Sequence, residues 1–66
     1  MVTVADALLE LEFLRHAAQR KADRKRAGGN RRETRETRDR IIAAYERERD
    51  ALAMAIDALK AQILND

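Results

Sequence analysis

The sequence predicts an all-α protein, an antiparallel hairpin of two long helices that self-associates into a four-helix bundle or coiled-coil dimer. Three observations predict this fold class. The 66-residue chain has no proline, and its two glycines are adjacent at Gly28 and Gly29. Alanine, leucine, glutamate, arginine and lysine, the strong helix formers, dominate the composition. On both sides of the glycine pair, apolar residues recur at spacings of three and four, the period of an amphipathic helix.

Residues 1–66 are long enough for one domain only. A domain this small usually needs disulfides, a metal or a partner chain to bury enough surface. The sequence has no cysteine and one histidine, His16, so it lacks the residues for disulfides and for thiolate or multi-histidine metal sites. We therefore expect no cofactor and no metal, and oligomerisation is the way that remains to bury apolar surface.

The first predicted helix covers residues 3–27. Thr3 is a suitable N-cap, and Asp6, three residues later, completes a capping box. Cations in the last turn suit the negative end of a helix. One face is apolar at helical spacing and contains Val4, Ala7, Leu8, Leu11, Leu14, Ala18 and Ala22. We expect this face to pack on the second helix.

Leu9 and Phe13 form a second apolar strip on the same helix. They are four residues apart and point roughly opposite the main face. A two-helix hairpin leaves such a strip bare, and large bare apolar groups indicate a further partner. Two interpretations stay open: the strip is core in a larger bundle, or it binds another protein.

Residues 28–30 form the predicted turn. A glycine can take the left-handed position that ends a helix, and Asn30 can cap the next one with Glu33 as its box partner. The alternative is one unbroken helix that tolerates both glycines. The register disfavours it, because the core positions before the turn do not continue into those after it.

The second predicted helix covers residues 31–64 and carries an apolar seam of the heptad kind. Its members are Ile42, Tyr45, Leu52, Ile56, Leu59 and Ile63. Arg49 interrupts the seam and is expected to snorkel or to pair with Glu46 or Glu48.

A tight turn would place Leu14 near Ile42 and Leu11 near Tyr45. Ile56 and the later seam residues would then lie at or beyond the end of the shorter helix, uncovered by their own chain. An antiparallel second copy covers them most simply, so we expect a homodimer. Three or four chains stay open. The expected oligomer seam combines Val4, Leu8, Leu11, Leu14, Ile42, Tyr45, Leu52, Ile56, Leu59 and Ile63.

Charge is distributed unevenly along the chain. Residues 1–18 carry one base against three acids, residues 19–40 ten against four, and residues 41–66 three against five. The basic candidates for contact with phosphate or an acidic surface are Arg20, Lys21, Arg24, Lys25, Arg26, Arg31, Arg32, Arg35 and Arg38. A solvated, salt-bridged helix end is the simpler interpretation. Glu33, Glu36 and Asp39 are interleaved, and the segment has no aromatic residue on which a base could stack.

Nothing in the sequence predicts an enzyme. It contains no serine or cysteine, and His16, four residues after Glu12, is expected to be a solvated histidine. The longest apolar run, residues 51–56, is far short of the roughly 20 residues of a membrane span, and no signal peptide is recognised. We expect a cytoplasmic, non-catalytic interaction protein that binds another protein and no small-molecule substrate. The alternative is a nucleic-acid-binding hairpin dimer that uses its basic tip.

Overall fold

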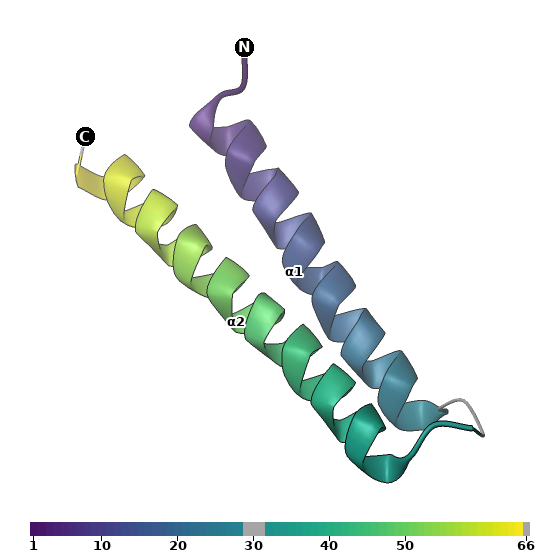
Figure 1. Cartoon of the computed structure of the whole chain (residues 1–66). Coiled ribbons are helices and arrows are strands. Elements are labelled where there is room, and N and C mark those ends of the chain that lie inside the picture. Colours follow the sequence, from purple (N-terminus) through teal and green to yellow (C-terminus); the bar gives the residue numbers. More distant parts are fainter. Residues whose placement is uncertain (29–31, 66) are drawn as a thin grey trace.

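The computed structural model describes residues 1–28 and 32–65 and shows a helical hairpin (Figure 1). Helix α1 spans Val4–Ala27 and helix α2 spans Arg35–Asn65. The two helices run antiparallel and pack against each other in a body 51 Å long and 18 by 16 Å across. The predicted all-α hairpin is therefore confirmed, and the alternative of one unbroken helix is wrong.

The first helix begins as its sequence predicts. The backbone amide of Asp6 donates to the Thr3 hydroxyl at 3.1 Å, and the Thr3 amide donates to the Asp6 carboxylate at 3.2 Å. These two bonds form the capping box and satisfy amides that have no partner within the helix. At the other end, the Gly28 amide donates to the Arg24 carbonyl at 3.2 Å. Gly28 is extended, with φ −165°, and so does not take the left-handed position. Gly29, the other glycine that could take it, lies outside the described residues.

The second helix begins at Arg35, four residues later than the predicted start at residue 31. Thr34 acts as its cap: the Thr34 hydroxyl accepts from the Thr37 amide at 3.1 Å, and the Thr34 carbonyl accepts from the Arg38 amide at 3.0 Å. The predicted cap at Asn30 lies outside the described residues. Glu33, its expected box partner, instead reaches across to α1.

The register between the helices differs from the one that a tight turn predicts. Tyr45 lies beside Lys21, with the ammonium 5.8 Å from the ring centroid, whereas the prediction placed it near Leu11. This is a difference of ten residues, or about three helical turns. Further along the pair, the Lys60 ammonium lies 3.9 Å from the Glu12 carboxylate. The predicted pairing of Leu14 with the region of Ile42 is therefore also wrong.

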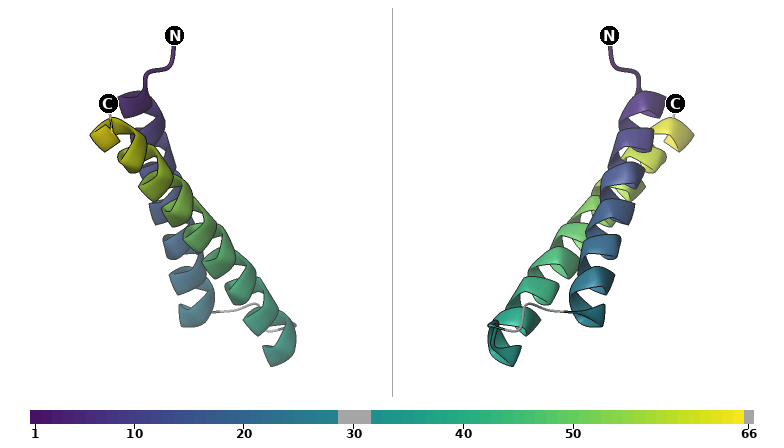
Figure 2. Two further views of the ribbon diagram at one scale, coloured as in Figure 1. Left: turned by 90° about the vertical axis from the view of Figure 1, so that its left-hand side faces the viewer. Right: turned by 90° about the vertical axis from the view of Figure 1, so that its right-hand side faces the viewer.

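The shift follows from where α2 begins relative to the end of α1. Ile42 lines a shallow hollow together with Arg26 and is therefore level with the last turn of α1. Residues 35–41 continue past that turn, by about 10 Å at 1.5 Å per residue, as Figure 2 shows. The longer helix thus projects at the turn, and its last residues lie beside the start of α1.

Burial follows this register. Ala18 and Ala22 are fully buried, Ile56 is 1% exposed and Ile42 is 8% exposed. The prediction that the hairpin leaves Ile56 uncovered is therefore wrong, and Leu59 is half-buried as well. Ile63 remains 48% exposed near the free end. On α1 the fully buried residues are alanines rather than leucines, since α2 covers a side chain of one carbon completely.

Candidate functional site

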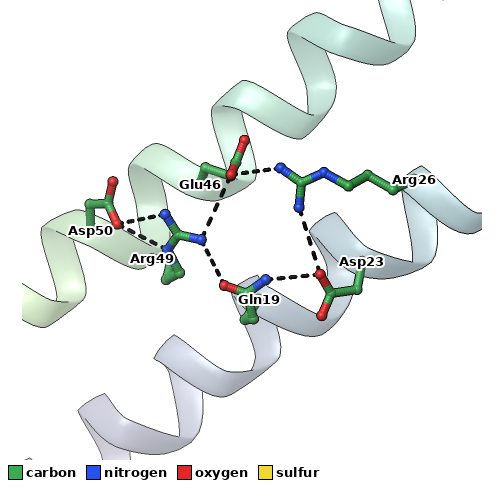
Figure 3. A network of polar contacts seen from close by, with 6 residues as sticks. All are labelled: Gln19, Asp23, Arg26, Glu46, Arg49 and Asp50. Carbon is green, nitrogen blue, oxygen red and sulfur yellow. Dashed lines mark hydrogen bonds and ion pairs between the residues drawn. The ribbon is translucent and has the colours of Figure 1, made fainter.

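The two helices form a layer with two broad faces, and polar side chains from both helices close one of them. Figure 3 shows six residues of this polar face: Gln19, Asp23, Arg26, Glu46, Arg49 and Asp50. Five of them form a closed ring. The Arg26 guanidinium lies 2.7 Å from the Glu46 carboxylate and 3.7 Å from that of Asp23. The Gln19 amide joins the helices, since it donates to Asp23 at 2.9 Å and accepts from Arg49 at 2.7 Å.

Arg49 is the centre of the polar face. Its guanidinium lies 3.7 Å from Glu46, which confirms the predicted pairing with that residue, and donates to Asp50 at 2.9 Å. The hydrogen bond to Asp50 is the main reason that the pKa of Arg49 lies above its ordinary value. The Gln19 contact was not predicted, because a partner 30 residues away depends on the register between the helices.

The opposite broad face is apolar. Successive residues of a helix are about 100° apart, so Leu14 and Ala17 lie on the side of the buried alanines away from Gln19. By the same geometry, the corresponding side of α2 lies away from Glu46 and Asp50. These side chains are only partly covered, with Leu14 40% exposed. We call this surface the apolar face; its members are Leu14, Ala17, Leu52, Ala55 and Leu59.

Charges of opposite sign lie at the two ends of the apolar face. Near the free ends of the chain, Asp6 and Glu10 line a hollow with Ala7 and Leu11. Near the turn, Lys21 and Arg24 line a second hollow with Tyr45, and the Lys21 ammonium lies over the Tyr45 ring. The apolar face therefore has an acidic end and a basic end.

Leu9 and Phe13 lie on the outer side of α1, away from α2. Their exposed fractions are 70% and 68%, so neither contributes to the core of the hairpin. This confirms the predicted direction of these two side chains, which we call the outer strip. On the outer side of α2, Met54 is 74% exposed.

The structure divides the predicted basic residues into paired and unpaired ones. Lys25 lies 2.7 Å from the buried carboxylate oxygen of Glu33 and balances its charge, which ties the segment before α2 to α1. Arg26 belongs to the polar ring and Lys21 contacts Tyr45, while Arg31 lies outside the described residues. Within residues 1–28 and 32–65, the members that form neither an ion pair nor a ring contact are Arg20, Arg24, Arg35 and Arg38, apart from Arg32, which has an interaction of its own.

The expected oligomer seam is split by the structure. Ile42 and Ile56 are buried between the helices, and Leu8, Leu11 and Tyr45 are half-buried. Val4, Leu14 and Ile63 are 40–48% exposed. The hairpin thus uses part of the seam for its own core and leaves another part at the surface.

His16 is exposed and lines a shallow hollow with Arg15, Gln19 and Asp50. Over the described residues, neither helix is long and apolar enough to cross a membrane.

Comparison with protein-family models, curated proteins and solved structures gives no match for this chain. The proposals below therefore depend on its own surface.

Proposed function

We propose that the chain is a non-catalytic interaction protein, which self-associates and binds another protein through the outer strip. The observation that carries this proposal is the exposure of Leu9 and Phe13, at 70% and 68%. Burying a side chain of this type is worth about 1.5–3 kcal/mol. Two such groups side by side on a rigid helix are the kind of anchor around which protein interfaces are built.

Self-association is supported by the small size of the core. The buried apolar residues among those described are Ala18, Ala22, Ile42 and Ile56. Two of these four are alanines, which bury little apolar area each. A hairpin with so thin a core gains stability from a second chain, because each additional apolar contact adds to a small total.

The location of the outer strip also makes the proposal testable. Neither side chain packs within the hairpin, so Leu9→Ala with Phe13→Ala removes the anchor and leaves the helix pair intact. The basic residues near the turn add electrostatic steering towards an acidic protein surface.

The test is affinity capture from an extract of the cells that make the protein, with and without nuclease. The wild type is expected to retain a protein partner in both conditions, and the double alanine variant is expected to lose it. Met54→Ala is the matched control, since Met54 is equally exposed but lies on α2. If the double variant retains the partner, or if it loses its helical circular dichroism, the outer strip does not have this role.

A second candidate function is binding of nucleic acid by the basic residues. The observation in its favour is that Arg20, Arg24, Arg35 and Arg38 form no ion pair over the described chain. Contacts of this kind are made to the phosphate backbone, so the affinity should fall steeply with salt and with Arg24→Glu. Equal, negligible binding of a labelled duplex and of a hairpin RNA at low salt would exclude it.

A further inference from the structure

The two broad faces of the hairpin differ in how far their side chains are satisfied or covered within the chain. On the polar face, five side chains satisfy one another in a closed ring. On the apolar face, Leu14, Leu52 and Leu59 are only partly covered. Each of them has an alanine of the same face, Ala17 or Ala55, three or four residues away. Of the two broad faces, the apolar face therefore offers more apolar surface for a second layer of helices to cover.

The charge of the hairpin sets the direction in which a second layer can pack. Residues 19–50, which form the half near the turn, carry twelve bases against seven acids. The other half, residues 1–18 and 51–66, carries two bases against five acids. The hairpin is thus positive at the turn and negative at its free ends. A parallel copy would place the two positive halves together, whereas an antiparallel copy places each positive half against a negative one.

We infer that the occupant of the apolar face is a second copy of this chain, packed antiparallel in one specific register. This inference rests on the self-association proposed above and adds its surface, direction and residue pairs. A two-fold axis perpendicular to the helices stacks α1 on α1 and α2 on α2. It places Glu10 level with Lys21 of the partner subunit, and Asp6 within one residue of Arg24 of the partner subunit.

The same register fits the apolar side chains. Antiparallel helices pair residues whose numbers have a constant sum, and the pairing of Glu10 with Lys21 of the partner subunit also pairs Leu14 with Ala17 of the partner subunit. Carried across the hairpin by its own register, it pairs Leu52 with Ala55 of the partner subunit. Leu14 and Leu52 then each meet an alanine, which is how close-packed layers interdigitate. By the same sum, Leu59 lies level with Glu48 of the partner subunit.

The area is sufficient for a stable dimer. A broad face of a body 51 Å long and 18 Å wide offers on the order of 800 Å² per subunit, the area of an interface of standard size. In this dimer Leu9 stays on the outer side of α1, whereas Phe13, one turn before Ala17, borders the contact with the second copy.

The test is a charge exchange followed by analytical ultracentrifugation at low salt. Glu10→Lys places a lysine against Lys21 of the partner subunit, and Lys21→Glu places two acids together. Each single change is expected to raise the dimer dissociation constant about tenfold, because the contact occurs twice in the dimer. The double variant, Glu10→Lys with Lys21→Glu, is expected to return to within about threefold of the wild type.

Arg47→Glu is the matched control, because Arg47 is exposed on the outer side of α2. Lys21→Glu also removes the contact with Tyr45, so helical circular dichroism of each variant is recorded in parallel. A wild type that is a folded monomer throughout the micromolar range overturns the inference. The inference is also overturned if the double variant dimerises no more tightly than the single variants. That result is the one expected of a parallel dimer.

A second measurement does not depend on charge. The chain contains no cysteine, so Leu14→Cys and Ala17→Cys variants can be mixed and oxidised. A disulfide requires α-carbons within about 7 Å of each other, and the proposed register pairs Leu14 with Ala17 of the partner subunit. We therefore expect a disulfide between the two chains. A mixture of Ala43→Cys and Ala58→Cys, both on the outer side of α2, is the control. If Leu9→Ala with Phe13→Ala dissolves the dimer, the outer strip is the contact between copies and the inference is wrong. If no dimer forms, this inference fails, but the binding of another protein by the outer strip is still tested separately by affinity capture.

Discussion

The polar face and the apolar face are built on the same two helices but satisfy their side chains in different ways. On the polar face, arginine, glutamate, aspartate and glutamine from both helices bond to one another, and water can reach what remains. On the apolar face, the leucine and alanine side chains are only partly covered by their own chain. The comparison teaches that a short hairpin can satisfy its polar groups on one broad face while apolar side chains stay partly exposed on the other.

The largest expected effect is at Ile56, which is buried between the two helices. Ile56→Ala removes the largest fully buried side chain and should lower the free energy of unfolding by about 2–5 kcal/mol. Urea unfolding followed by circular dichroism measures this difference. Met54→Ala, at an exposed position nearby, should change the same quantity by less than about 0.5 kcal/mol. Equal effects of the two substitutions would show that Ile56 is not buried between the helices.

The next effect separates the faces directly. Ala55→Glu places a carboxylate on the apolar face close to the proposed two-fold axis, where the partner would bury it without a counter-charge. The dissociation constant of the dimer should rise about a hundredfold, as measured by sedimentation equilibrium. Ala58→Glu adds the same charge on the outer side of α2 and should leave the dimer intact. A dimer insensitive to Ala55→Glu would contradict the use of the apolar face.

A smaller effect is expected on the polar face. Glu46→Gln removes the carboxylate charge with which Arg26 and Arg49 both form ion pairs. The side chains of the two arginines are partly exposed. The free energy of unfolding should fall by about 1 kcal/mol at low salt and by less in 1 M salt, because salt screens the lost attraction. Thermal unfolding at two salt concentrations measures the change. A loss that is independent of salt would indicate that Glu46 contributes by packing.

The smallest effect is expected where neither face is involved. Glu36 and Arg40 form an exposed ion pair at 2.9 Å within the first turns of α2, which project beyond α1. Glu36→Gln should change the free energy of unfolding by about 0.2–0.5 kcal/mol. The measurement is the same urea titration as for Ile56→Ala. A change above about 1 kcal/mol would mean that this part of α2 has contacts beyond its own helix.

The features that were predicted correctly depend on residues close together in the sequence. Thr3 and Asp6 form a capping box because both partners lie within one turn. The first helix ends at Ala27, directly before Gly28, and the direction of Leu9 and Phe13 follows from helical spacing alone. The cap at Thr34 was missed, although a threonine before the acidic first turn of a helix is a signal for one.

The register was not predictable in the same way. The prediction assumed that a turn at residues 28–30 reverses the chain at once, so that α2 would begin level with the end of α1. Because α2 begins beyond the end of α1, every facing pair moves by several turns. The ring around Gln19 and Arg49 and the burial of Ile56 both follow from that shift.

The sequence by itself determined that this chain is helical, where its first helix begins and ends, and which side chains point outward, because these depend on bonds and angles within a few residues. Only the tertiary structure decided which residues face one another, and therefore which face is closed by a polar ring and which remains apolar. The physical reason is that the pairing of two helices depends on one loop path and one fit of side chains. Local preferences of the two helices are compatible with several such fits.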